Sequence, residues 1–103
     1  MQNKSFYAKV YKIVSKIPKG KVATYQTIAR LAGSPGAARA VGTAMKNNPD
    51  MKMIPCHRVV GSDGKMRGYS AGNGVATKIK MLKAEGVDIV GNKAQLQTSA
   101  WKA

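Results

Sequence analysis

Apolar residues recur at helical spacing in the first part of the chain, over residues 5–16. The positions that form this apolar stripe are Phe6, Val10, Ile13 and Val14. The lysines of the segment fall on other faces, so the pattern predicts an amphipathic helix with one buried side. The sequence Ile17-Pro18-Lys19-Gly20 follows and ends that helix.

Two more helices are predicted on either side of a tight turn. Thr24 can cap a helix that runs to about Leu31 and that Gly33 ends. Ser34-Pro35 then predicts the start of a third helix, with serine at the N-cap and proline at the first helical position. This third helix runs to about Lys46. Helix, turn and helix in this order are typical of a helix-turn-helix.

The second half of the chain predicts short strands around one more helix. Residues 59–66 read as strand, Asp-Gly turn and strand, and residues 67–73 as a glycine-rich loop that can wall a pocket. A helix follows from about Gly74 to Ala84, and residues 87–96 predict a terminal hairpin. On that helix we expect an inward face and a mostly solvated face, made respectively by Val75, Ile79 and Leu82, and by Lys78, Lys80 and Lys83.

These elements together predict the fold class. We expect a mainly helical α/β protein with a winged-helix-like helix-turn-helix and small β-hairpins, in a single domain over residues 1–103. The chain has no run of about 18 apolar residues that could span a membrane, and no signal-type apolar core follows its first residues. We therefore expect a soluble intracellular protein, in which a free thiol stays reduced.

The charge of the chain narrows the choice of partner. Its 103 residues carry 18 Lys and Arg against 4 acids, which gives a net charge of +14 and a pI near 10.3. Such a field attracts polyanions. A membrane surface is the alternative partner, but the lysines are spread along the whole chain and do not gather on one amphipathic helix. We therefore favour nucleic acid and expect no membrane association.

The third predicted helix consists mostly of small residues between Gly36 and Ala44, and Arg39 stands out among them. Small side chains over more than two turns let a helix come very close to another surface. That surface is either a neighbouring core helix or a narrow minor groove, and both can be true on opposite faces of the helix. In the second case Arg39 could reach into the base stack.

Candidate chemistry centres on Cys56, the only cysteine, which stands beside the only histidine, His57. With the only glutamate, Glu85, they supply the thiol, imidazole and carboxylate of an activated sulfur nucleophile. The alternatives are a buried structural cysteine and a solvated surface glutamate. Neighbours on a strand point to opposite faces, so we expect a bridging water between Cys56 and His57 unless the backbone turns there.

The same residues bear on metal binding and on disulfides. A single cysteine excludes an internal disulfide. One cysteine, one histidine and one glutamate at these spacings fit no structural zinc site. We therefore expect no metal.

Several short motifs follow one another along the chain in a fixed order. They are Thr24-Tyr25-Gln26-Thr27-Ile28-Ala29, Ala38-Arg39-Ala40-Val41-Gly42, Asn47-Asn48-Pro49, Ile54-Pro55-Cys56-His57-Arg58-Val59-Val60, Gly68-Tyr69-Ser70 and Ala84-Glu85-Gly86-Val87. Over about residues 5–90 the chain resembles the DNA-binding, alkyl-accepting domain of the O6-alkylguanine-DNA alkyltransferases. The motifs in register are highly specific, whereas any one of them alone is not.

The resemblance implies a chemical role for each matching residue. Cys56 accepts the alkyl group from guanine O6 in an SN2 transfer, His57 deprotonates Cys56 through a water, and Glu85 holds His57. Asn48 braces the turn that carries the active site. Tyr25 helps to rotate the phosphate during base flipping and protonates guanine N3 as the base leaves.

The resemblance also implies a DNA surface and a substrate pocket. Arg39 is the finger that fills the hole left by the flipped guanine. The base has to flip because the O6 substituent is out of reach inside the duplex. The other implied contacts in the minor groove are Tyr25, Ala37, Ala38, Ala40 and Gly42. The implied pocket is lined by Tyr69, Ser70, Met45 and Val59, with Ser70 near O6. Ala71 stands where the family often has glycine and trims this pocket.

Two departures from the family pattern leave a second function open. The family's usual N-terminal domain is absent, and the short length and the Trp101-Lys102 tail resemble the alkyltransferase-like proteins, which bind alkylguanine without repairing it. Those proteins typically carry Trp or Ala at the cysteine position, whereas Cys56 is present here. We therefore favour single-turnover repair over a non-enzymatic damage sensor.

The expected setting of this activity follows from the same resemblance. We expect a monomer that acts on double-stranded DNA containing O6-alkylguanine, with methyl as the first candidate for the alkyl group. Its location is then cytoplasmic, at the nucleoid. A general thiol hydrolase is the remaining alternative, which the basic charge and the helix-turn-helix disfavour.

Overall fold

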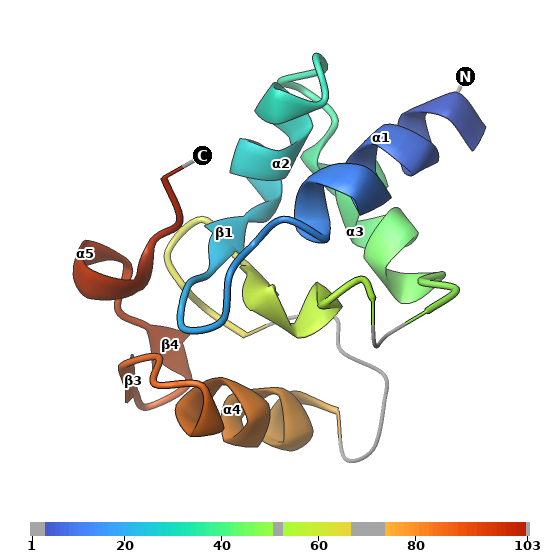
Figure 1. The fold of residues 1–103 in the computed structure, drawn as a ribbon. Coiled ribbons are helices and arrows are strands. Elements are labelled where there is room, and N and C mark those ends of the chain that lie inside the picture. Colours follow the sequence, from blue (N-terminus) through green and yellow to red (C-terminus); the bar gives the residue numbers. More distant parts are fainter. Residues whose placement is uncertain (1–3, 51–52, 67–73, 103) are drawn as a thin grey trace.

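The computed structural model describes residues 4–50, 53–66 and 74–102 (Figure 1). Its elements in chain order are α1 (Lys4–Val14), β1 (Ala23–Thr24), α2 (Tyr25–Leu31), α3 (Ala38–Lys46), the 3-10 turn η1 (Cys56–Arg58), β2 (Val59–Val60), α4 (Val75–Ala84), β3 (Ile89–Val90), β4 (Lys93–Ala94) and α5 (Leu96–Ser99). The mainly helical α/β class is confirmed. Among the described residues, no helix is long and apolar enough to cross a membrane.

The first three helices pack around a shared apolar core. Val10 of α1 is fully buried in one cluster with Ile28 of α2 and Val41 of α3, which confirms the apolar stripe predicted for the first helix. Burying a side chain of this size stabilises the fold by roughly 1.5–3 kcal/mol. The Tyr11 hydroxyl donates to the Ala44 carbonyl at 2.9 Å and so ties α1 to α3.

Helices α2 and α3 form the predicted helix-turn-helix. Thr24 caps α2 as expected, since its Oγ1 accepts a hydrogen bond from the Thr27 amide at 3.0 Å. Gly33 follows α2 with φ +86°, a backbone conformation that favours glycine. The cap at Thr24 and the glycine that ends α2 are therefore both as the sequence predicted.

The predicted start of the third helix at Ser34-Pro35 is wrong. The Ser34 amide donates to the Ala29 carbonyl at 2.9 Å, which keeps Ser34 attached to the end of α2. The Ser34 carbonyl accepts from the Ala37 amide at 2.9 Å and closes a separate turn, after which α3 begins at Ala38. The serine thus completes the exit from one helix and does not cap the next.

The strand pairing differs from the hairpin predicted for residues 59–66. Strand β2 pairs with β1 in parallel, and both residues of β2 are fully buried. The Asp-Gly turn is present, because the Gly61 amide donates to the Lys65 carbonyl at 2.9 Å. Lys65, however, forms its bridge with Lys93 of β4. The two halves of the predicted hairpin therefore join different parts of the protein.

The end of the chain folds back beside this sheet. Strands β3 and β4 form the predicted terminal hairpin. The hairpin touches the turn at Gly64, where φ is +87° and where a Cβ would collide with the Ala94 carbonyl oxygen, so only glycine fits. The Val22 amide donates to the Ser99 carbonyl at 2.8 Å, and the Val22 carbonyl accepts from the Trp101 amide at 2.7 Å. These bonds brace the approach to β1.

Helix α4 confirms one predicted face and contradicts the other at a single residue. Leu82 is fully buried and Val75 packs against the same apolar cluster, as expected, and Lys80 is exposed. Lys78 was predicted to be solvated and is instead only 1% exposed. It lies three residues after Val75 and four before Leu82, so helical spacing places it on their face.

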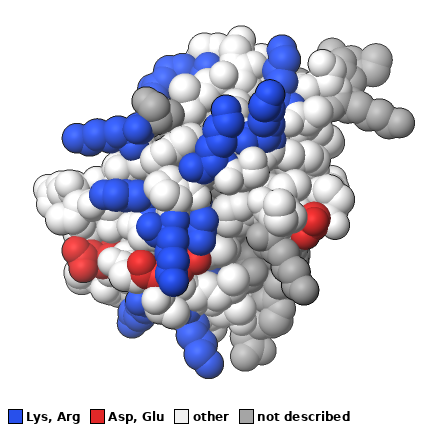
Figure 2. Space-filling model, viewed as in Figure 1, with Lys and Arg blue, Asp and Glu red and all other residues white. Residues whose placement is uncertain are grey.

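The face of the protein seen in Figure 2 is rich in cationic side chains. Figure 2 shows Lys and Arg side chains across the visible face, with acidic side chains in a few small spots. On this face the positive charge is spread over several elements and is not confined to one helix.

Candidate functional site

Cys56 lies at the start of η1, immediately before the buried strand β2. The Cys56 amide donates to the Ile54 carbonyl at 2.8 Å, and the Arg58 amide donates to the Pro55 carbonyl at 2.9 Å. The backbone therefore turns between Cys56 and His57, where an extended strand was one expectation. Both residues are 5% exposed. Water screens charges only weakly at such a buried position, so interactions between groups there are strong.

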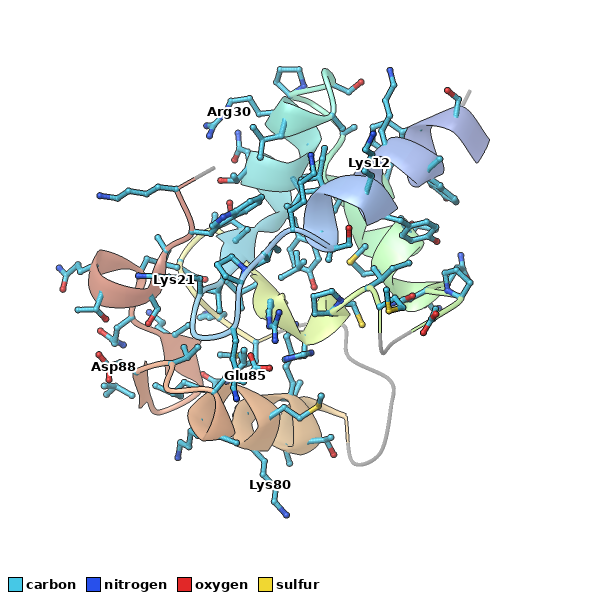
Figure 3. All side chains as sticks on the ribbon, viewed as in Figure 1. Lys12, Lys21, Arg30, Lys80, Glu85 and Asp88 are labelled. Atoms are coloured by element: carbon cyan, nitrogen blue, oxygen red, sulfur yellow. The ribbon has the colours of Figure 1, made fainter. Side chains whose placement is uncertain are left out.

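Glu85 lies at the end of α4 (Figure 3) and forms a hydrogen bond with the His57 ring. Glu85 Oε2 lies 3.0 Å from His57 Nε2. An ionised carboxylate can only accept, so His57 donates from Nε2 and its Nδ1 is left as the proton acceptor of the ring. The glutamate thus selects the tautomer in which the imidazole can act as a base.

Arg58 fixes the same carboxylate from the other side. Its Nε donates to Glu85 Oε1 at 2.9 Å, and its Nη2 donates to Glu85 Oε2 at 2.7 Å. Its Nη1 donates to the Ile17 carbonyl at 2.7 Å, which links the group to the loop after α1. A bidentate, charge-assisted pair of this kind has a defined geometry. Glu85 is therefore held in one orientation toward His57.

Burial and these hydrogen bonds set the protonation states of the pair. Burial lowers the pKa of His57, against the opposing effect of its hydrogen bond with Glu85, so the imidazole is neutral at pH 7. Burial alone would raise the pKa of Glu85, but the hydrogen bonds from Arg58 and His57 outweigh it and the pKa is lowered. A neutral imidazole beside a charged carboxylate can serve as a general base.

Asn48 bridges the end of α3 and the segment that leads to Cys56. Its Nδ2 donates to the Ile54 carbonyl at 2.7 Å, and its Oδ1 accepts from the Asp50 amide at 2.8 Å. Because Ile54 in turn accepts from the Cys56 amide, Asn48 reaches the cysteine through one intervening residue. Asn48 thus contacts the segment before Cys56, and its role in bracing the active-site turn stays a prediction.

A groove of about 610 Å³ lies between α3, the start of α2 and the turn after β2. Its lining residues are Tyr25, Gln26, Ala38, Arg39, Gly42, Thr43, Lys46, Gly61 and Ser62. Arg39 and Lys46 are exposed, while Ala38 and Gly42 are half-buried. The groove thus combines cationic side chains with a surface of small ones, which suits the close approach of a polyanion.

The structure brings some of the predicted DNA-binding residues together and separates others. Tyr25, Ala38, Arg39 and Gly42 all line this groove. Ala37 is half-buried and packs against the core of the first three helices, and Ala40 is half-buried outside the groove lining. One face of α3 therefore packs in the core and another lines the groove, and the docking of the second face in a DNA minor groove stays a prediction.

The predicted pocket residues are only partly described. Met45 and Val59 are buried in the same core cluster as Cys56. Tyr69, Ser70 and Ala71 lie outside the described residues.

Two residues of the site received no role from the sequence. Arg58 is part of the cysteine motif, but nothing in its neighbours along the chain indicated a hydrogen bond to Glu85, 27 residues away. Lys78 was assigned to solvent, although its spacing from Val75 and Leu82 was the signal that could have found it.

The fold and the site together define a small helix-turn-helix domain with a buried Cys–His–Glu centre. The sequence profile described as "6-O-methylguanine DNA methyltransferase, DNA binding domain" matches residues 5–87. The chain belongs to this family, and the resemblance drawn from its motifs is confirmed.

Named relatives match one part of their own length. The methylated-DNA–protein-cysteine methyltransferase of Cricetulus griseus is 47% identical over 84% of this chain and 41% of the relative. The protein of the same name from Mycobacterium tuberculosis (strain ATCC 25618 / H37Rv) is 42% identical over 82% of this chain and 50% of the relative. The chain thus spans half or less of the length of these two relatives.

Two solved structures with DNA are similar to this one. S. pombe Atl1, in complex with damaged DNA containing O6-carboxymethylguanine, has a TM-score of 0.88 and 39% identity and is covered over 100% of both chains. Mycobacterium tuberculosis OGT in complex with DNA has a TM-score of 0.75 and 42% identity, over 82% of this chain and 52% of that one.

Proposed function

We propose that this protein repairs alkylated DNA by moving an alkyl group, methyl first of all, from guanine O6 to Cys56. A bond forms between the Cys56 sulfur and the alkyl carbon as the bond from that carbon to O6 breaks, and the electron pair stays on the guanine. The thiol proton passes through a water to His57, and the leaving base takes one proton from Tyr25. The products are an S-alkyl cysteine and unmodified guanine, so each molecule reacts once.

The observation that carries this proposal is the hydrogen-bonded group of His57, Glu85 and Arg58 next to Cys56 in the chain. A cysteine that only filled space would not need a neutral histidine next to it, fixed in one tautomer by a glutamate and an arginine. The transfer requires no metal or cofactor, because the thiolate itself is the nucleophile. Asn48 supports the turn, and Met45, Val59, Tyr69 and Ser70 complete the proposed pocket.

The groove supplies the proposed DNA contact. The small face of α3 enters the minor groove, with Ala38 and Gly42 against the DNA and Arg39 replacing the flipped guanine in the stack. Ala37 and Ala40 then serve mainly to seat α3. One copy of the chain carries all these parts, so the protein acts as a monomer, on DNA in the cytoplasmic nucleoid.

A second candidate function is recognition of the lesion without transfer. The observation that favours it is the similarity to S. pombe Atl1 over the whole length of both chains. In that case the protein marks alkylguanine for another repair pathway and Cys56 is not consumed.

Intact mass measurement separates the two functions. After incubation with duplex DNA that contains O6-methylguanine, the protein should gain the mass of one methyl group, with one equivalent of lesion consumed per molecule. Cys56→Ser should gain nothing while it still binds the DNA. Tight binding of the lesion by the parent protein with no change in mass would establish the recognition function and overturn the transfer.

A further inference from the structure

Thr43 lies on the face of α3 that lines the groove and has no part in the proposed transfer. It is exposed, and with Arg39, Gly42 and Lys46 it follows the i, i+3, i+4, i+7 spacing of one helix face. All four residues line the groove. A Cβ atom placed on Gly42 would meet nothing within 4 Å, so the surface beside Thr43 is open. The hydroxyl of Thr43 is therefore accessible to a molecule that docks against this face.

The hydroxyl proton of Thr43 is already used within the helix. Its Oγ1 donates to the Arg39 carbonyl at 3.3 Å. A carbonyl oxygen can only accept, so the single proton of the hydroxyl points to it. The lone pairs of Oγ1 remain for a bond to the docked molecule. Toward the groove, Thr43 is therefore a hydrogen-bond acceptor.

Other polar side chains of the groove are less selective. Arg39 and Lys46 carry only donors, and Gln26 carries both donors and an acceptor. Every base pair presents acceptors in the minor groove, whereas only a G·C pair presents a donor there, the 2-amino group of guanine. A donor side chain therefore fits any base pair in that groove, but a side chain that can only accept fits guanine.

We propose that Thr43 accepts a hydrogen bond from the 2-amino group of a guanine beside the lesion, so that the protein prefers lesions with a G·C neighbour. An A·T neighbour offers only acceptors. Against it the hydroxyl either meets them with its lone pairs or gives up its bond to Arg39, and both are unfavourable.

The spacing along α3 places Thr43 near the base pairs that flank the lesion. In the proposed function Arg39 takes the place of the flipped guanine, and Thr43 lies one helical turn, about 5.4 Å, further along the same face. Since stacked base pairs are about 3.4 Å apart, this distance corresponds to about one to two base pairs. The inference rests on the proposed docking of α3 in the minor groove and adds a preference for the neighbouring sequence.

Base pairs that differ in the minor-groove amine test the proposal. G·C carries the 2-amino group and inosine·C lacks it, while A·T lacks it and 2,6-diaminopurine·T carries it. Each pair is placed in turn one or two steps to either side of a single O6-methylguanine in a duplex. Affinity is measured by a binding titration with Cys56→Ser, so that no transfer consumes the lesion. The rate of methyl transfer by the parent protein at low DNA concentration provides a second ranking of the same duplexes.

The expected result is a preference for the amine at one of these positions. Duplexes with the amine should bind about fivefold more tightly than those without it, the effect of one hydrogen bond. Thr43→Val in the same background keeps the shape of the side chain without the hydroxyl and should lose the preference, whereas Thr43→Ser should keep it. Thr98→Val removes an exposed hydroxyl outside the groove and should also keep it.

The comparison of Thr43→Val with its background separates the contact from the shape of the DNA. Removing the amine also changes the DNA itself, and this effect cancels in a cycle that combines the two changes. An equal preference with and without the Thr43 hydroxyl would assign it to the DNA and overturn the proposal. Equal binding of all the duplexes before Thr43 is changed would overturn it as well.

The two proposals fail separately. Methyl transfer to Cys56 without an amine preference rejects the role of Thr43 and leaves the repair function intact. An amine preference that depends on Thr43, in a protein whose Cys56 gains no methyl group, rejects the transfer and keeps the contact.

Discussion

The groove along α3 and the centre around η1 use charge in opposite ways. In the groove, Arg39 and Lys46 are exposed among small residues, where water and salt screen them. In the centre, His57 and Lys78 are nearly inaccessible and Glu85 is held by short bonds. Removing a screened charge costs the fold little, whereas removing a buried one leaves its partner unsatisfied. Substitutions in the centre should therefore change the chemistry, and those in the groove should change binding.

The largest effect is expected from Glu85→Gln. An amide is uncharged and offers one acceptor oxygen, so it cannot hold both His57 and Arg58 as the carboxylate does. Methyl transfer should slow by roughly 100-fold or more, the usual scale for a disturbed acid–base group. The affinity for duplex DNA should change little, because Glu85 lies outside the groove lining. Single-turnover kinetics and a binding titration measure the two quantities.

Asp88→Asn is the matched control for this loss of a carboxylate. Asp88 is exposed in the C-terminal part of the chain and accepts a hydrogen bond from Thr98 Oγ1 at 3.0 Å (Figure 3). It changes the net charge by the same amount and should leave the transfer rate at the parent value. If Glu85→Gln also reacts at the parent rate, the His57–Glu85 bond has no part in the chemistry.

A smaller and more selective effect is expected from Arg39→Ala. Flipping a base costs a few kcal/mol of stacking and pairing, and an inserted guanidinium replaces part of this loss. Repair of duplex DNA should fall roughly tenfold or more, while reaction with free O6-benzylguanine, which needs no flipping, should stay close to the parent rate. Arg39→Lys should recover only part of the duplex rate, because an ammonium lacks the planar group with several donors.

The ratio of the duplex repair rate to the free-base rate separates a role of Arg39 in base flipping from a general effect of its positive charge. Arg30→Ala removes the same charge from an exposed position on α2 that does not line the groove. It should leave the ratio of duplex rate to free-base rate unchanged. Equal losses on both substrates in Arg39→Ala would place Arg39 in support of the fold or the thiol, outside the groove's function.

Local signals in the sequence predicted the first three helices better than the centre. The stripe of α1, the Thr24 cap and the small residues of α3 depend on neighbours within a few positions, and all are found as expected. Ser34-Pro35 carried a local signal too, but a hydrogen bond from Ser34 to the end of α2 decided its role. Strand β2 likewise pairs with β1 across more than thirty residues, which its own Asp-Gly turn could not indicate.

The centre was predictable only where the chain offers no second choice. Cys56, His57 and Glu85 are single residues of their types, so their association could be proposed before their positions were known. The chain has many arginines and lysines, and composition does not indicate which of them is buried. Arg58 and Lys78 are set apart by long-range packing, and for Lys78 the helical spacing outweighed the usual preference of lysine for water.

The smallest effect in this comparison is expected from Lys46→Ala in the groove. Lys46 is exposed at the end of α3, where neutralising one phosphate contributes modestly to binding. Affinity for undamaged duplex should fall a few-fold, and the slope of log affinity against log salt should become shallower by about 0.9, the value for one phosphate that the protein no longer neutralises. Lys80→Ala gives the same net charge from an exposed lysine of α4 that points away from the protein (Figure 3). It should keep the parent slope if DNA docks in the groove. Equal slopes for the two variants would mean that the whole cationic field binds DNA and that the groove does not direct it.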